Sequence, residues 1–114
     1  MKSYTDLEQS KKLAEFLPLE SADIRYHTVS HYNPYICDEI IYTMDFGRVS
    51  GKDIPCWSLA ALLNVLPKSL IYTPNPTLDG YCCKNIMHDL ETYGDNPIDA
   101  CYEMILELYK QNLI

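Results

Sequence analysis

The sequence is poor in the residues that build phosphate-binding and nucleic-acid-binding sites. Its four glycines, at positions 47, 51, 80 and 94, are too scattered to form a glycine-rich phosphate loop. There are 9 basic against 16 acidic residues, a net charge of −7, and Lys11-Lys12 is the only adjacent basic pair. Because nucleic acids and anionic membranes are bound through clustered Lys and Arg, both are disfavoured as partners.

A bilayer-spanning run and a secretory signal are also absent from the sequence. The longest nearly uninterrupted apolar stretch, Ile54–Leu66, is shorter than a transmembrane helix requires. Met1–Asp6 leads directly into charged residues without an apolar segment. The five cysteines are an odd number and cannot all pair within one chain, so reduced thiols in the cytoplasm are expected.

Length and periodicity predict one α+β domain over residues 1–114. The hydrophobic fraction of 47% and the charged fraction of 22% are typical of a globular protein. The order α-β-β-α-β-β-α is predicted, with elements at residues 6–17, 22–29, 36–46, 56–66, 69–73, 81–87 and 97–109. A short helix across 37–43 is an alternative to the second strand, and residues 88–95 are predicted to form a polar loop. Antiparallel strands are expected to pack around a buried central helix.

Segment 56–66 is expected to be that central helix and the main source of stability. Its apolar residues cover almost every side, and a helix that is apolar all round is buried. Pro55 suits its first turn, and Pro67 marks its end. Substitution of either Leu62 or Leu63 by alanine is expected to cost about 2–5 kcal/mol of folding free energy.

The first and last helices carry local start signals. Thr5, three residues before Glu8, gives a capping-box pattern with Thr5 at the N-cap. Asn96 followed by Pro97 predicts the N-cap and first turn of the last helix. Both helices are therefore expected to begin from hydrogen bonds made within one turn.

Cys56 is the one thiol whose sequence context resembles a catalytic segment. Residues 56–60, Cys-Trp-Ser-Leu-Ala, are similar to the segment around the nucleophile of papain-like proteases. A helix N-terminus would lower the pKa of this thiol, with His88 as base and Asn96 as its orienting residue. However, Asp53-Ile54-Pro55 replaces the expected preceding residues, and no glutamine lies just upstream. We therefore expect no catalytic residue here and a small, buried structural thiol at Cys56.

No metal or cofactor site is predicted. Cys82, Cys83 and His88 lack the paired C-x₂-C spacing of structural zinc sites. His27 and His31 are four residues apart, which would place them on one face of a helix, but they fall in or beside a predicted strand.

The stretch from residue 85 to residue 109 is acidic and has no Lys or Arg. It holds the six carboxylates Asp89, Glu91, Asp95, Asp99, Glu103 and Glu107. Its start partly matches a calcium-binding loop, but Tyr93 and Ala100 occupy positions that need oxygen ligands, so an EF-hand is excluded. Such a charge block either serves as a solvated surface or steers a basic partner.

The ten tyrosines are the other marked feature of the composition. Tyr26, Tyr32, Tyr35 and Tyr42 crowd one region of the chain. Tyrosine is enriched at protein interfaces, but it also suits half-buried strands. Both interpretations stay open from sequence.

Three parts of the chain together resemble a family of short proteins found in gut anaerobic bacteria and in their phages and mobile elements. The similar segments are residues 7–15 with 17–23, residues 55–63, and residues 95–101 with 103–105. The family has no established activity, so the resemblance implies no catalytic residues. It implies a cytosolic protein of phage or mobile-element type.

The sequence thus predicts a small non-catalytic protein that acts by binding another protein or a second copy of itself. A first alternative is an acidic inhibitor that mimics nucleic-acid charge, which requires the carboxylates of residues 89–107 to form one continuous exposed stripe. A second alternative is a thiol enzyme, which requires Cys56 to be exposed with a lowered pKa.

Overall fold

The computed structural model describes residues 2–33, 36–46, 53–67, 75–77 and 80–114. Its helices are α1 (Leu7–Ala14), η1 (Leu19–Ser21, a 3₁₀ turn), α2 (Leu59–Val65) and α3 (Pro97–Lys110). Its strands are β1 (Ile24–Asn33), β2 (Ile36–Phe46), β3 (Ile54–Cys56), β4 (Asn75–Thr77), β5 (Gly80–Asn85) and β6 (Leu90–Gly94). The predicted α+β class and the order α-β-β-α-β-β-α are confirmed, with the three-residue strands β3 and β4 as additions.

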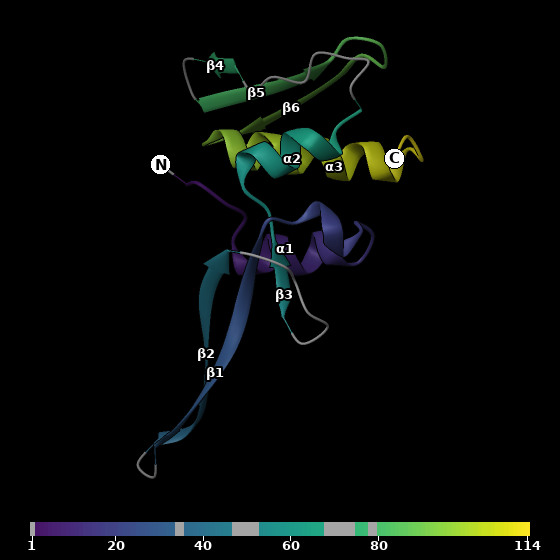
Figure 1. Ribbon diagram of the computed structural model, residues 1–114. Helices are drawn as coiled ribbons and strands as arrows, with labels where there is room; N and C mark the ends of the chain where they lie inside the picture. The colour runs from purple at the N-terminus through teal and green to yellow at the C-terminus, as the bar shows by residue number, and fades with distance from the viewer. Residues whose placement is uncertain (1, 34–35, 47–52, 68–74, 78–79) are drawn as a thin grey trace.

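The strands form two antiparallel sheets on opposite sides of the helices. One sheet has the strand order β2-β1-β3 and the other β4-β5-β6. Figure 1 shows the β4-β5-β6 sheet on one side of α2 and α3, while α1, β3 and the long β1–β2 hairpin lie on the other side. Among the described residues, no helix is long and apolar enough to cross a membrane.

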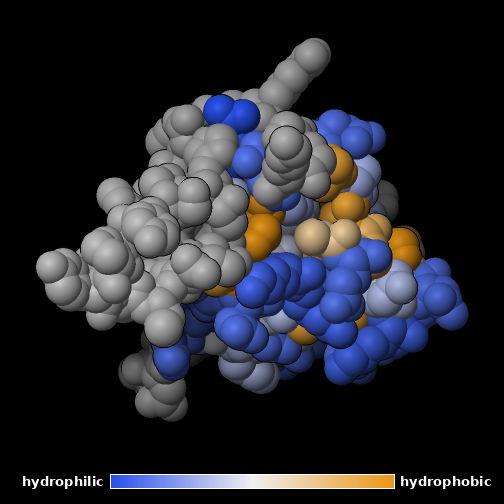
Figure 2. Space-filling model, turned by 90° about the horizontal axis from the view of Figure 1, so that it is seen from below, coloured by the Kyte–Doolittle hydropathy of each residue, from blue (hydrophilic) through white to orange (hydrophobic). Residues whose placement is uncertain are grey.

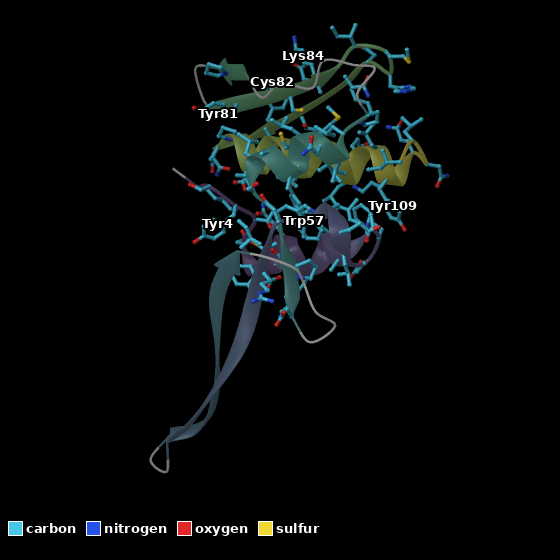
Figure 3. The ribbon with its side chains drawn as sticks, viewed as in Figure 1. Tyr4, Trp57, Tyr81, Cys82, Lys84 and Tyr109 are labelled. Carbon is cyan, nitrogen blue, oxygen red and sulfur yellow. The ribbon has the colours of Figure 1, made fainter. Side chains whose placement is uncertain are left out.

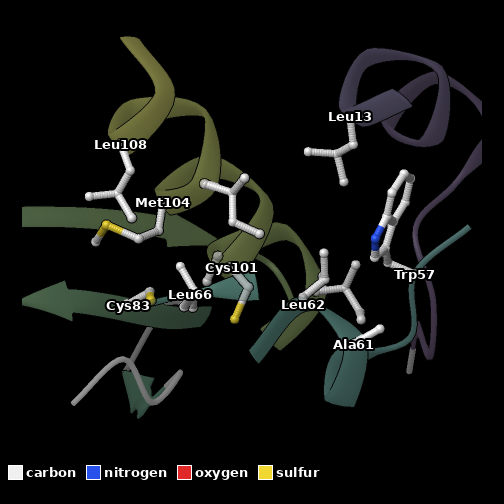
Figure 4. Packing of buried hydrophobic residues seen from close by; sticks show 12 residues of the cluster. Leu13, Trp57, Ala61, Leu62, Leu66, Cys83, Cys101, Met104 and Leu108 are labelled. Atoms are coloured by element: carbon white, nitrogen blue, oxygen red, sulfur yellow. The ribbon is translucent and has the colours of Figure 1, made fainter. Parts of the chain in front are cut away.

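The core lies where α2, α3 and β5 meet. Trp57, Leu62 and Leu108 are all fully buried, and Cys83 from β5 packs into the same cluster (Figure 4). The described surface seen in Figure 2 is mainly hydrophilic, with small apolar groups between the polar residues. Burial of this one apolar cluster is the main driving force for folding.

The start of the central helix differs from its prediction. Cys56 does not open the helix but ends β3, where it pairs with Ile24 of β1. The helix begins at Leu59, because the side chain of Ser58 accepts a hydrogen bond from the Ala61 amide and so acts as the N-cap. Leu63 retains 36% exposure, so its predicted full burial is wrong.

The predicted polar loop at residues 88–95 is also wrong, because most of it is strand β6. β6 pairs with β5, with Glu91 opposite Lys84 and Gly94 opposite Tyr81. Its residues alternate between exposed and half-buried positions. An edge strand with one solvated face needs few apolar residues, so its amino-acid composition resembles that of a polar loop. The strand predicted at residues 69–73 lies outside the described residues.

The cap of α1 is Asp6, not Thr5. The Asp6 side chain accepts from the Gln9 amide at 2.8 Å, and the Gln9 side chain accepts from the Asp6 amide at 3.1 Å. Thr5 is fully buried and accepts a hydrogen bond from the Trp57 amide at 3.1 Å, so it is used for tertiary contact. The predicted cap of α3 is confirmed, since the Asn96 side chain accepts from the Asp99 amide at 2.9 Å.

Asp99 joins the N-terminal segment to α3. Its Oδ1 accepts from Lys2 Nζ at 2.9 Å and from Gln9 Nε2 at 2.8 Å. Burial acts to raise the pKa of Asp99, but the hydrogen bonds from Lys2 and Gln9 outweigh it and hold the pKa below the ordinary value of 3.8.

This network predicts acid sensitivity. A carboxyl group whose folded-state pKa is lowered stabilises the fold fully above its unfolded-state pKa and loses that effect as the pH falls through the folded-state pKa. We expect Asp99→Asn to remove about 1 kcal/mol at neutral pH and to flatten the decline in stability below about pH 4. Urea denaturation at a series of pH values measures this. Glu103→Gln, an exposed change on the same helix, should keep the wild-type pH profile.

Candidate functional site

Cys56 lies in a closed polar cluster and not in a cleft. It is fully buried, its Sγ donates to the Thr5 carbonyl at 3.3 Å, and Thr5 Oγ1 donates to Sγ at 3.6 Å. Burial raises the pKa of the Cys56 thiol despite the hydrogen bonds from Thr5, Ser10 and Tyr26. This environment is the reverse of what a nucleophilic thiolate needs.

The two residues named as helpers of Cys56 are placed elsewhere. His88 is exposed in the turn between β5 and β6, and this turn lies on the other side of α2 and α3 from β3 (Figure 1). Asn96 is occupied as the cap of α3 and also donates to Asp99. The structure therefore does not bring Cys56, His88 and Asn96 together.

The residues considered for metal binding are also separated. Cys82 Sγ donates to Glu91 Oε1 at 3.1 Å, and burial together with Glu91 raises the pKa of Cys82 to about 11. Cys83 belongs instead to the core, where a hydrogen bond with Cys101 and burial raise its pKa. In the described part of the chain, no three His, Cys, Asp or Glu residues form a group that could hold a metal ion.

His27 and His31 both lie in β1. Four residues along a strand span about 13 Å, so the two backbone positions are too far apart for both imidazoles to bind one ion. Their helical spacing in the sequence has no structural counterpart.

The acidic residues of the C-terminal third are partly neutralised by lysines. Asp99 pairs with Lys2 at 2.9 Å, and Glu91 lies 3.6 Å from Lys84. A third ion pair, at 3.9 Å, joins Glu107 to Lys110. These pairs interrupt the negative surface, which weighs against a continuous stripe that mimics nucleic acid.

The feature that projects most from the molecule is the β1–β2 ribbon, defined as Ile24–Asn33 with Ile36–Phe46. Figure 1 shows its distal part standing clear of the body. It accounts for a longest dimension of 55 Å and a radius of gyration of 15.9 Å, where about 13 Å is typical of this chain length. Strands of 10 and 11 residues are about twice the usual length.

In the part of the chain that the structure describes, only the base of the ribbon pairs with the rest of the protein. β3 pairs with Ile24, Arg25 and Tyr26 of β1 and goes no further. Within the described residues, the edge of β1 from residue 27 to residue 33 and the outer edge of β2 pair with no other strand. Over about 24 Å of β1, the ribbon therefore presents backbone donors and acceptors that no other described strand pairs with.

The base of the ribbon is fixed to the core. Ile24 is 1% exposed, and the Tyr26 hydroxyl donates to the Thr5 carbonyl at 2.9 Å. Burial and the neighbouring Cys56 raise the pKa of Tyr26, which keeps this hydroxyl protonated as a donor. Asp23 accepts hydrogen bonds from both the amide and the hydroxyl of Ser58, which ties the start of β1 to α2.

The tyrosine-rich region coincides largely with this ribbon. Tyr26 is half-buried at its base, Tyr32 lies in β1 and Tyr42 in β2, while Tyr35 lies outside the described residues. Sequence reasoning found both strands but missed that they leave the body. The one available signal was the strand predicted at residues 36–46, whose 11 residues are about twice the usual strand length; the first strand was predicted to end at residue 29 but extends to Asn33.

Comparison of the chain with protein-family models, with curated proteins and with solved structures finds no match.

Proposed function

We propose that this protein acts by binding protein through strand addition at the β1 edge of the ribbon, with a second copy of the chain as the strand that is added. The supporting observation is that no other described strand pairs with the β1 edge beyond Tyr26. A two-stranded ribbon is only marginally stable in water, and a third strand stabilises it by completing its backbone hydrogen bonds.

Charge favours β1 over β2 as the binding edge. β2 carries Asp38, Glu39 and Asp45 and no basic residue, so a second β2 beside it would bring like charges together. Residues 27–33 of β1 contain no Asp or Glu. The acidic residues thus protect the β2 edge from self-pairing, which is a common protection of exposed strands, and leave the β1 edge available.

The strand geometry allows a closed, symmetric dimer. Because β3 occupies the outer edge of β1 only as far as Tyr26, a second β1 can continue along the same edge towards the tip. Antiparallel pairing of the two 27–33 segments gives the order β2-β1-β1-β2 across a two-fold axis. Such an arrangement uses the same surface on both copies and therefore stops at two.

Two supporting inferences concern the setting of this activity. Cys56, Cys82, Cys83 and Cys101 are unpaired thiols, which supports a reducing compartment such as the cytoplasm. The resemblance of segments 7–23, 55–63 and 95–105 to proteins of gut anaerobes and their phages supports a phage or mobile-element origin.

A pair of lysine substitutions, one on each strand of the ribbon, tests the proposal. We expect a dimer by light scattering, with slow hydrogen exchange at the amides of residues 27–33. Ser30→Lys, at the centre of the 27–33 segment, places two lysines directly opposite each other across the two-fold axis and should weaken the dimer on the order of 5-fold. Thr43→Lys, on β2, should leave it intact. A monomer from micromolar to millimolar concentration with fast-exchanging β1 amides, or an equal loss in both variants, would overturn the proposal.

A further inference from the structure

A hollow of about 490 Å³ lies on the body of the protein, away from the ribbon. Segments far apart in the sequence line it: the end of α1 with η1, the end of α2, the end of α3 and the last residue. The lining residues are Phe16, Leu17, Pro18, Glu20, Ser21, Asn64, Val65, Tyr109 and Ile114. Its size is in the range of sites that bind small molecules.

An aromatic pair forms one side of the hollow. The rings of Phe16 and Tyr109 stack with centroids 4.0 Å apart and an interplanar angle of 13°. Tyr109 retains 48% exposure, and Figure 3 shows it between α3 and the α1–η1 segment. A half-exposed aromatic ring can hold another flat ring by stacking or a cation over its face.

The C-terminal end of α3 is shaped so that the chain turns back over the hollow. Asn112 has a φ of 57°, in the left-handed region. The Leu113 amide donates to the Leu108 carbonyl at 2.8 Å, and the Asn112 amide donates to the Tyr109 carbonyl at 3.1 Å. These two bonds form a Schellman cap, which directs Ile114 to the lining instead of letting the helix continue.

The charged side chain in the described lining of the hollow is negative. Among the lining residues that the structure describes, Glu20 is the only one with a charged side chain, and none is Lys, Arg or His. The C-terminal ends of α2 and α3, near Asn64 and Tyr109, add the negative end of their helix dipoles. A molecule that combines an apolar ring with a positively charged group therefore fits the hollow better than a neutral or an anionic molecule.

We propose that this hollow is a binding site for a small aromatic amine, with the ring of the ligand against Phe16, Tyr109 and Val65 and its ammonium group near Glu20. The fluorescence of Trp57 reports on this site, because its side chain is hydrogen-bonded to the lining residue Ser21. Its Nε1 donates to Ser21 Oγ at 2.9 Å, and Ser21 Oγ donates in turn to the Pro18 carbonyl at 2.6 Å. Trp57 is the only tryptophan, so its emission is unambiguous.

The test uses three probes that share a phenyl ring and differ in charge: 2-phenylethylamine, 2-phenylethanol and 3-phenylpropionate. Each is titrated into the full chain while Trp57 emission and ligand-observed NMR saturation transfer are recorded. We expect the amine to bind most tightly and the carboxylate most weakly. Glu20→Gln should lower the affinity for the amine about 2- to 5-fold, the range of an exposed ion pair, and leave the affinity for the alcohol unchanged.

Two further variants separate the site from nonspecific binding. Val65→Phe fills the hollow and should abolish binding of all three probes, while Glu8→Gln, an exposed carboxylate on α1 outside the hollow, should change nothing. If Val65→Phe does not fold, a competition experiment on the wild-type chain, in which the amine displaces the alcohol, tests instead whether the two probes share one site. Absence of saturable binding, equal affinity for the amine and the carboxylate, or an unchanged amine preference in Glu20→Gln would overturn the proposal.

Discussion

Leu62→Ala is expected to lower the free energy of unfolding by about 2–5 kcal/mol, because it opens a cavity in the centre of the core. Leu62 is fully buried on the inner face of α2, in the cluster that also holds Trp57 and Met104. This part of the core is bounded by two helices and a strand, so the neighbours have little freedom to fill the space.

Leu63→Ala is the matched control for Leu62→Ala. The two leucines are adjacent in one helix and lose the same atoms, but Leu63 retains 36% exposure. Leu63→Ala should lower the free energy of unfolding by less than about 1 kcal/mol, since exposed positions tolerate such changes. Urea denaturation with a common slope compares the two directly. Equal losses in both variants would contradict the orientation of α2 described above.

Gly94→Ala is expected to destabilise the protein by about 3 kcal/mol or more, because β6 and the first turn of α3 touch at this glycine. A Cβ added at Gly94 would lie 2.5 Å from the Ala100 nitrogen and 2.7 Å from Asp99 Cβ. Backbone cannot rotate away as a flexible side chain can, so relief requires α3 to move off the sheet. That movement would also stretch the 2.9 Å hydrogen bond from Thr92 Oγ1 to the Ala100 carbonyl.

Asp95→Ala, at the next and exposed position, is the control for Gly94→Ala and should stay within about 0.5 kcal/mol of the wild type. Thermal and urea unfolding of both variants give the comparison. Wild-type stability in Gly94→Ala would show that α3 does not approach β6 as closely as described.

The local sequence was sufficient to predict a helix or strand where the interactions that stabilise it are local. Asn96 and Pro97 start α3 with hydrogen bonds inside its first turn, and these were predicted. The bounds of β2 and the start of β1, to within two residues, follow from alternation and turn residues. In each case the deciding residues lie within a few positions of one another.

The candidate sites could not be predicted in this way, because distant segments build them. Thr5 looks like a helix cap but is held by Trp57, and Cys56 looks like the start of a helix but pairs with Ile24. The residues that line the hollow are spread along the chain from Phe16 to Ile114, and no spacing in the sequence predicts that they lie together.

The sequence by itself determined the α+β class, the order of the main elements, the start of α3 and the shortage of positive charge. Tertiary structure decided which side of α2 is buried, that residues 90–94 form a strand, and that the ribbon extends beyond β3 with an edge that no described strand covers. The physical reason is that hydrogen bonds within a turn and the period of a pattern are properties of short segments. Burial and the free edge of a strand instead depend on which remote segment lies beside it.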